Sequence, residues 1–208
     1  MTPDHGPSDV DLMLRVKHDS EALTVLVERY QVRLLAYIRR VIHDAVEAED
    51  LFQETFIRVM RAADRYEPRA SFATWIFTIA RNLCIDRIKK KTGLPTTSLE
   101  SLEAQSPGVR RPGQRSRNPE PPGHEPDPAD AVETAEQVAL LRAAIDELPD
   151  SKREALVLRL QSGMPYHEIA EIQGAPVGTV KYRVHEAIRL VAERLGVPRE
   201  LVDVRRKR

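Results

Sequence analysis

The sequence predicts an all-α protein made of two small helical domains joined by a long proline-rich linker. Apolar residues recur at three- and four-residue spacing over most of the chain, and no stretch shows the strict alternation of a β-strand. Eight of the 15 prolines lie between Pro95 and Pro128, where apolar residues are scarce. The 208 residues are enough for one large domain, or for two small ones flanking that segment.

The expected divisions follow these changes in composition. They are a flexible lead over residues 1–8, a helical domain over 9–91, the linker over 92–130, a second helical domain over 131–197 and a basic tail over 198–208. Lys and Arg number 32, as do Asp and Glu, so the chain has no net charge. The charges are nevertheless segregated, with acidic residues in 44–54 and basic ones in 87–91 and in the terminal RRKR. A neutral total therefore does not exclude nucleic acid as a partner.

Cys84 is the only cysteine, which excludes an intrachain disulfide and a cysteine-rich metal site. It lies on or beside an apolar helix face, where we expect a small buried thiol. The first residues contain no apolar core of the signal-peptide type, and no run is long enough to span a bilayer. We therefore expect a cytoplasmic protein with no direct membrane insertion, no metal and no cofactor.

Three helices are expected in the first part of the chain. Residues 9–17 predict a short helix, and Asp19 or Ser20 can cap a longer one that runs to about Ile42. The acidic cluster at 44–49 suits the start of a third helix, which continues to about Tyr66. The buried side of this third helix is predicted as Leu51, Phe52, Phe56, Val59 and Ala63, and its outer side as Asp50, Gln53, Glu54, Ile57, Arg58 and Arg61.

One apolar residue inside that polar outer side, Ile57, is typical of a modest protein-binding patch and equally of a plain solvated face.

A fourth helix is predicted over residues 71–91, SFATWIFTIARNLCIDRIKKK. Spacing assigns its buried side to Phe72, Trp75, Ile76, Ile79, Leu83 and Ile88, and its outer side to Thr74, Thr78, Arg81, Asn82 and Asp86. An aromatic start and a cationic end suit a groove rich in phosphate and exposed bases. Taken alone, however, the segment favours a core helix with a solvated basic end, since cations stabilise any helix C-terminus.

Helical spacing returns at about Ala131 and continues to Pro149. Ser151, with Glu154 three residues later, predicts a capping box at the start of the next helix. Gly163 is expected to end that helix. Its predicted buried residues are Ala155, Leu156, Leu158 and Leu160.

Residues 166–195 have the organisation of a helix-turn-helix. Gly174 suits the left-handed position at the end of a short helix, and Pro176 suits the start of the next. An apolar seam from Val180 to Leu195 leaves an outer face that can contact phosphates and base edges. Together these features favour DNA binding over an ordinary helical hairpin. The outer face is Lys181, Tyr182, Arg183, His185 and Glu186.

Four motifs make the chain resemble an extracytoplasmic-function (ECF) sigma factor, the smallest class of bacterial RNA polymerase specificity subunits. They are AEDLFQETFIRV, FATWIFTIARNLCIDRIKK, ELPDSKREALVLRL and YHEIAEIQGAPVGTVKYRVHEA, and the resemblance covers residues 11–91 and 134–196. It implies a sigma-2-like domain that docks on core polymerase and opens the minus-ten promoter element. It also implies a sigma-4-like helix-turn-helix domain that recognises the minus-thirty-five element, and promoter-directed initiation without catalysis by this chain.

The resemblance also implies site residues and partners. For the minus-ten element these are Trp75, Arg81, Asn82, Arg87 and Lys89, with the loop 66–71. For the minus-thirty-five element they are Thr179, Lys181, Tyr182, Arg183, His185 and Glu186. For the clamp of the largest polymerase subunit they are Asp50, Gln53, Glu54 and Arg58. Other expected partners are promoter DNA, the flap of the second polymerase subunit, and an anti-sigma factor that could hold the protein at the inner membrane, away from the nucleoid.

The recognition helix departs from the usual pattern of the class at two positions. Tyr182 stands where serine is more usual, and Glu186 stands where a basic residue is more usual. A carboxylate cannot bind phosphate or guanine acceptors but could accept a hydrogen bond from cytosine. The promoter sequence therefore cannot be copied from better-known relatives, and the unusually long linker leaves its own path open.

Two other classes of protein fit the sequence less well. A helix-turn-helix regulator with a ligand-sensing domain would bind duplex DNA alone, usually as a dimer. The neutral charge and the outer side of the third helix argue against it. An enzyme would need a nucleophile, metal-ligand spacing or a phosphate loop near its six histidines, and these histidines are scattered.

Overall fold

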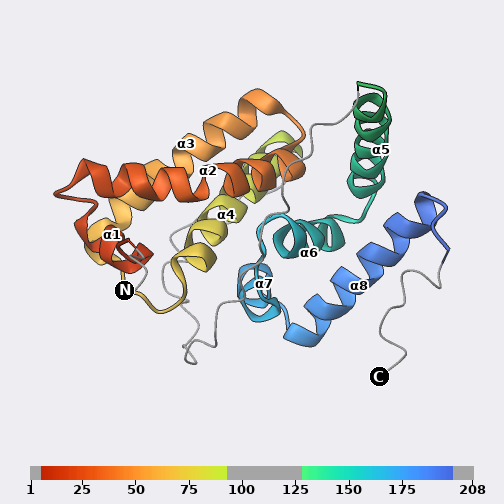
Figure 1. Ribbon diagram of the computed structural model, residues 1–208. Coiled ribbons are helices and arrows are strands. Elements are labelled where there is room, and N and C mark those ends of the chain that lie inside the picture. The colour runs from red at the N-terminus through yellow and green to blue at the C-terminus, as the bar shows by residue number, and fades with distance from the viewer. Residues whose placement is uncertain (1–5, 93–127, 199–208) are drawn as a thin grey trace, which may run out of the picture.

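The computed structural model describes residues 6–92 and 128–198, and every regular element in these ranges is helical (Figure 1). The predicted all-α class is thus confirmed. Predictions on the lead before Gly6, on 93–127 of the linker and on the tail from 199 lie outside the described residues. The elements are α1 (Asp9–Arg15), α2 (Ser20–Ile42), α3 (Ala45–Ala62), the 3₁₀ turn η1 (Ala63–Arg65), α4 (Phe72–Thr92), α5 (Pro128–Asp146), α6 (Asp150–Leu160), α7 (Tyr166–Gln173) and α8 (Val177–Arg194).

Side chains cap the first three helices. The Ser8 hydroxyl accepts from the Asp11 amide at 3.2 Å, and the Asp11 carboxylate accepts from the Ser8 amide at 3.2 Å, which makes a capping box for α1. Asp19 caps α2 by accepting from the Glu21 amide at 3.0 Å, as predicted. Asp44 caps α3. The α-helical part of α3 ends at Ala62, before the predicted Tyr66, because η1 tightens its last turn.

Helices α2, α3 and α4 pack on one another and form the core of the N-terminal half (Figure 1). Aromatic pairs fix the contact between α2 and α4. Tyr37 meets Phe77 edge to face with ring centroids 5.4 Å apart, and Tyr30 meets Phe72 in the same way at 5.1 Å. Such pairs stabilise a core by about 0.5–1.5 kcal/mol each beyond the area that they bury.

Helix α4 is buried on more sides than its spacing predicts. Thr74, predicted on the outer side, is only 3% exposed, and Ile88, predicted on the buried side, is 39% exposed. Helix α4 contacts α7 in addition to α2 and α3, so it is covered on more than one side. Cys84 is fully buried, as predicted.

The C-terminal half corrects two predictions at α6. No side chain caps this helix, because it begins at Asp150 with Pro149 as its N-cap, so Ser151 lies inside the first turn and the predicted capping box does not form. The Glu154 carboxylate instead accepts hydrogen bonds from three other helices, from Tyr37, Arg81 and Gln173. Leu160 is 64% exposed rather than buried, and Val157 occupies the core.

The prediction for Gly174 is confirmed, because it ends α7 in the left-handed conformation with φ of 58°. Helix α6 ends earlier than predicted, at Leu160 with Gln161 as its C-cap, and Gly163 takes a positive φ of 66° in the turn that follows. Helices α7 and α8 then form the helix-turn-helix. Val180, Val184, Ala187 and Val191 of the predicted seam are buried.

The two halves are in contact rather than apart. Helix α6 packs on α2 and α7 packs on α4, so that buried residues of both halves belong to one apolar core (Figure 1). Within the described ranges, no helix has the length and apolar character needed to cross a membrane.

The turn of the helix-turn-helix gives a stability prediction. A Cβ at Gly174 would meet no atom within 4 Å, so Gly174→Ala introduces only the strain of a positive φ. We expect it to lower the free energy of unfolding by about 1 kcal/mol in urea denaturation. Gly178→Ala is the matched control, because Gly178 lies in the first turn of α8 with equal space and no positive φ. It should leave stability unchanged or raise it; equal losses in both variants would contradict the explanation.

Candidate nucleic-acid interface

Aromatic side chains gather where the loop 66–71 meets the start of α4. The ring centroid of Trp75 lies 4.9 Å from that of Tyr66 and 5.8 Å from that of Phe72. Tyr66 and Phe72 are buried, while Trp75 is half-buried. Burial raises the pKa of Tyr66 to about 12, and its hydroxyl has no hydrogen-bond partner among the described residues. The cluster therefore offers the accessible part of the Trp75 ring as an apolar surface on which a base could stack, with the Tyr66 hydroxyl buried behind it.

Three of the predicted minus-ten residues share one stripe of α4. Trp75, Asn82 and Lys89 are each seven residues apart, so they lie two helical turns apart on the same side. Each is half-buried, with part of its side chain in solvent. The stripe thus places an aromatic ring, an amide and an ammonium group in a line, which suits successive nucleotides of a single strand.

The other two predicted minus-ten residues point elsewhere. Arg81 donates from Nε to Glu154 at 2.8 Å. Arg87 lies 3.5 Å from Glu47 of α3, whose carboxylate also pairs with Lys91 at 2.6 Å. Both arginines are therefore committed to carboxylates within the protein in this conformation.

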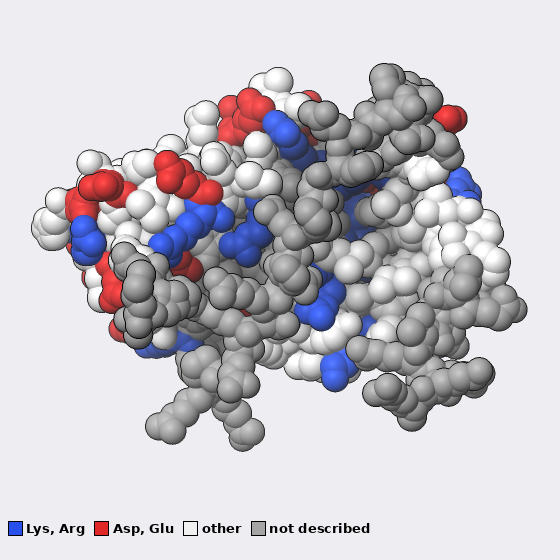
Figure 2. Space-filling model, viewed as in Figure 1, with Lys and Arg blue, Asp and Glu red and all other residues white. Residues whose placement is uncertain are grey.

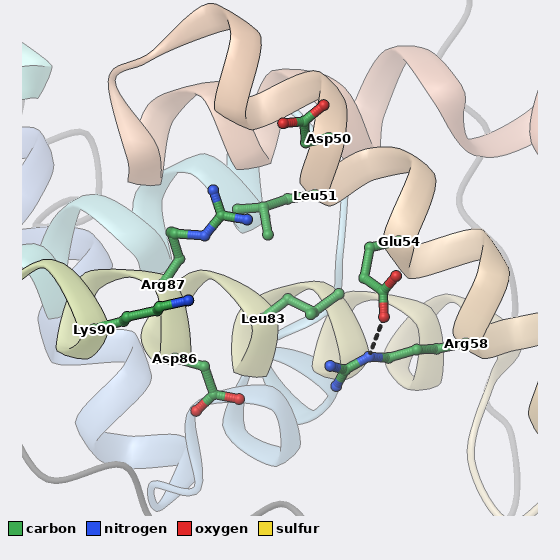
Figure 3. A pocket seen from close by; sticks show the side chains of 8 residues that line it. All are labelled: Asp50, Leu51, Glu54, Arg58, Leu83, Asp86, Arg87 and Lys90. Atoms are coloured by element: carbon green, nitrogen blue, oxygen red, sulfur yellow. Dashed lines mark hydrogen bonds and ion pairs between the residues drawn. The ribbon is translucent and has the colours of Figure 1, made fainter.

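Helices α3 and α4 border an open groove of about 420 Å³ (Figure 3). The predicted clamp residues Asp50, Glu54 and Arg58 line it from α3, while Gln53 is exposed beside it. Arg58 Nε lies 3.1 Å from the Glu54 carboxylate, and the two residues are four positions apart, which is about one helical turn. Arg87, which points into the groove in Figure 3, thus lies beside the predicted docking residues rather than on the minus-ten stripe. Ile57 and Met60 of α3 are 40% and 51% exposed.

Charges of both signs cover this side of the molecule. Figure 2 shows acidic and basic side chains close together over the α2 and α3 region, and further basic side chains nearer the centre of the view. Where both signs meet, nearby carboxylates offset part of the attraction to phosphate.

Some side chains on the outer face of α8 are exposed to solvent, and others are held by hydrogen bonds within the protein. Lys181, Tyr182 and His185 are exposed, Tyr182 to 61%, and Thr179 is half-buried. Arg183 donates to the amide oxygen of Gln173 on α7 at 2.8 Å. The part of α8 that can approach a DNA groove is therefore centred on Tyr182.

Glu186 is held within its own helix. Arg189 donates to its two carboxylate oxygens at 2.7 and 3.0 Å, and these hydrogen bonds lower the pKa of Glu186. Lys152 lies 3.9 Å away. Both acceptor atoms that could bind cytosine are thus already occupied in this conformation.

Titratable groups show no arrangement typical of catalysis or metal binding in the described ranges. No three His, Cys, Asp or Glu side chains there are grouped as metal ligands. Burial is the main cause that raises the pKa of Cys84 to about 12, so its thiol stays protonated and poorly nucleophilic.

The sequence did not predict which residues bind the predicted DNA-contacting arginines within the protein. Glu47, Glu154 and Gln173 each bind a predicted DNA-contacting arginine from another helix. Spacing along one helix predicts which side faces the core, but it carries no signal for which partner helix supplies a carboxylate or amide. Tyr66, in contrast, could be identified from the sequence, because the loop 66–71 that contains it was predicted as part of the minus-ten site.

Comparisons with known protein families match both halves. Residues 26–93 match the family model of Sigma-70 region 2, and residues 139–191 match that of Sigma-70, region 4. The ECF RNA polymerase sigma factor SigW of Bacillus subtilis is 35% identical over 176 residues, which are 83% of this chain and 90% of that protein. The RNA polymerase sigma-H factor of Pseudomonas aeruginosa is 32% identical, over 86% of this chain and 89% of its own length.

Solved structures share the fold. CnrH in complex with the cytosolic domain of CnrY superposes with a TM-score of 0.60 at 22% identity, covering 91% of this chain and 97% of that chain. The sigma factor RpoE of Bartonella quintana, in complex with the anti-sigma factor NepR, gives a TM-score of 0.57 at 22% identity, covering 83% and 97%.

Proposed function

The chain belongs to the extracytoplasmic-function family of RNA polymerase sigma factors, and from this membership we propose how its two helical halves divide the recognition of a promoter. It is a promoter-recognising sigma factor. We propose that it binds core RNA polymerase, directs initiation and performs no catalytic step itself. The observation that carries this proposal is the pairing of an aromatic and polar stripe on α4 with an exposed helix-turn-helix face on α8 in one chain.

The minus-ten element is assigned to α4 and the loop before it. Trp75, Asn82 and Lys89 form the primary surface, and Tyr66 supports the Trp75 ring from below. Arg81 joins this surface only after it leaves Glu154. Strand opening fits such a surface, because aromatic stacking and a backbone cation stabilise unpaired bases without requiring a duplex.

Docking on the polymerase clamp is assigned to the outer side of α3. Asp50, Gln53, Glu54 and Arg58 form a polar rim, and the exposed Ile57 supplies an apolar centre. An apolar centre inside a polar rim is the usual anatomy of a protein interface. Arg87 extends the same surface from α4.

The minus-thirty-five element is assigned to α8. Lys181, Tyr182 and His185 would make the direct contacts, with Thr179 beside them. Arg183 and Glu186 act first as structural residues, since Gln173 and Arg189 hold them, and contact DNA only if they exchange partners.

Further partners follow from family membership and from the neighbouring structures. An anti-sigma factor is proposed because the Bartonella RpoE was solved in complex with the anti-sigma factor NepR. The flap of the second polymerase subunit is proposed for the C-terminal half. As a polymerase subunit the protein would act in the cytoplasm at the nucleoid, and an inhibitor could sequester it at the inner membrane.

Transcription in vitro tests the function. Core RNA polymerase with the full-length protein should produce transcripts from a limited set of promoters in a genomic fragment library, and core enzyme alone should not. A library in which the added protein changes neither the number nor the position of starts would rule the function out.

Asn82→Ala is expected to reduce promoter opening about ten-fold while leaving the Kd for core polymerase within about two-fold, because one polar contact to unpaired DNA is lost. Permanganate footprinting measures opening, and fluorescence anisotropy measures core binding. Gln53→Ala is the matched control on α3 and should show the opposite pattern. Loss of core binding in Asn82→Ala would contradict the assignment of its face.

Tyr182→Ser is expected to change the preferred base at one or two positions of the minus-thirty-five element, since a mismatched pair in a recognition site costs about 1–3 kcal/mol. Selection from a randomised promoter library measures this preference. Arg194→Ala, at the far end of the same helix, pairs with Glu147 and should leave it unchanged. An unaltered preference in Tyr182→Ser would remove Tyr182 from the contact surface.

A further inference from the structure

A half-buried carboxylate joins the two halves of the molecule. Glu154, at the start of α6, accepts at Oε1 from the Tyr37 hydroxyl at 2.7 Å and from Arg81 Nε at 2.8 Å. The Glu154 side chain is only 13% exposed, and Tyr37 is fully buried. Burial raises the pKa of Tyr37 well above its ordinary value, so its hydroxyl remains a donor. One carboxylate therefore fixes α6 to both α2 and α4.

A second set of contacts lies on the same side of α2. Arg40 pairs with Asp146 at 2.8 Å, and Arg33 donates to the carbonyl oxygen of Ser162 at 3.4 Å. Arg33, Tyr37 and Arg40 are four and three residues apart, so they form one face of α2. We call the contacts of Glu154 and Asp146 with this face and with Arg81 the interdomain clasp.

The clasp extends to the recognition helix. Gln173 donates from Nε2 to Glu154 Oε2 at 2.8 Å, and its Oε1 accepts from Arg183 at 2.8 Å. An unbroken series of hydrogen bonds thus runs from Arg81 on α4, through Glu154 and Gln173, to Arg183 on α8. It occupies one arginine from each predicted DNA-contacting surface.

This closed arrangement cannot span a promoter. The centres of the minus-ten and minus-thirty-five elements are about 25 base pairs apart, which is about 85 Å of duplex at ~3.4 Å per pair. Two domains of about 70 residues in contact have their centres only about 25–30 Å apart, given a radius of gyration of about 11 Å. The 35 residues from 93 to 127 could reach up to about 115 Å when extended, so the chain itself permits separation.

We propose that the interdomain clasp holds the free protein in a closed resting state, in which Asp146 and Glu154 fix the C-terminal half to α2, and Glu154 takes the place of a promoter phosphate on Arg81 of α4. Promoter DNA bound to polymerase and Glu154 then compete for Arg81. This inference rests on the proposed function only for the identity of the competing ligand, since the closed state itself is a property of the free chain.

The closed state can be measured by the distance between spin labels on the two halves. Val46→Cys in α3 and Leu160→Cys in α6 place the labels at positions that are 72% and 64% exposed. The native Cys84 is buried and its pKa is about 12, so it should not take up the label in the folded protein. Wild-type protein in this background should give one narrow distance distribution.

Arg40→Asp should open the clasp, because it places two carboxylates against each other at Asp146. We expect a broad population of longer distances. Combining it with Asp146→Arg restores an opposite-charge pair and should restore the narrow distribution. Arg39→Asp is the matched control, because it makes the same charge change one residue earlier but breaks only the 3.0 Å pair with Glu49 inside the N-terminal half. Thermal melts of each variant check folding.

Binding to single-stranded minus-ten DNA without polymerase supplies a second readout. If nine molecules in ten are closed in the wild-type protein, opening all of them should lower the apparent Kd for this DNA by up to about ten-fold. Arg40→Asp removes a cation, so general electrostatics predicts the opposite, weaker binding. Tighter binding in Arg40→Asp, reversed in the charge-swapped pair, supports the proposal.

Two results would overturn the clasp: a broad, long distance distribution in the wild-type background, or an unchanged distribution in folded Arg40→Asp. Promoter-selective transcription with core polymerase would persist in either case if only the clasp is wrong. Absence of that transcription with a narrow wild-type distance would instead refute the proposed function.

Discussion

The burial of α4 between two sets of helices is the constraint from which the rest of the molecule follows. Helices α2 and α3 cover it from the N-terminal half, and α7 covers it from the C-terminal half. The covered sides are fixed by edge-to-face aromatic contacts and by fully buried residues such as Phe77 and Ile76. What stays accessible is a narrow stripe from Trp75 to Lys89 and the groove beside α3. Packing, rather than composition, thereby selects which polar side chains of this helix can meet a ligand.

Several charged side chains of this protein pair with one another, and this pairing affects how a chain with no net charge can bind DNA. Arg81, Arg87 and Lys91 face carboxylates, and Glu186 faces Arg189. A half-buried pair of this kind is screened less by salt than an exposed one. Removing one partner of a buried pair costs about 3–5 kcal/mol, whereas an exposed pair contributes about 0–1 kcal/mol. Among the described residues, these pairs reduce the positive charge that is available for general attraction to DNA.

Local sequence signals predicted the elements well, because caps and glycines act over a few residues. Asp19 caps α2 and Gly174 ends α7, as their positions predict. The errors occur where a distant helix intervenes. Thr74 is buried and Ile88 is exposed, in a helix that contacts α2, α3 and α7, and spacing along α4 alone carries no information about these contacts. Glu154 illustrates the same limit for the site: its spacing from Ser151 fits a capping box, but the stronger donors Tyr37 and Arg81 come from helices more than 70 residues away in sequence.

The state of Cys84 has a consequence for how such a protein can sense its surroundings. Peroxides and disulfide-forming reagents attack the thiolate of an accessible cysteine. Here the single sulfur atom is enclosed in the helical core and remains a neutral thiol at any pH found in a living cell. Oxidants therefore find no reactive thiol in this folded chain, and a thiol-based response to oxidative stress would have to be relayed by a different molecule that carries the reactive cysteine.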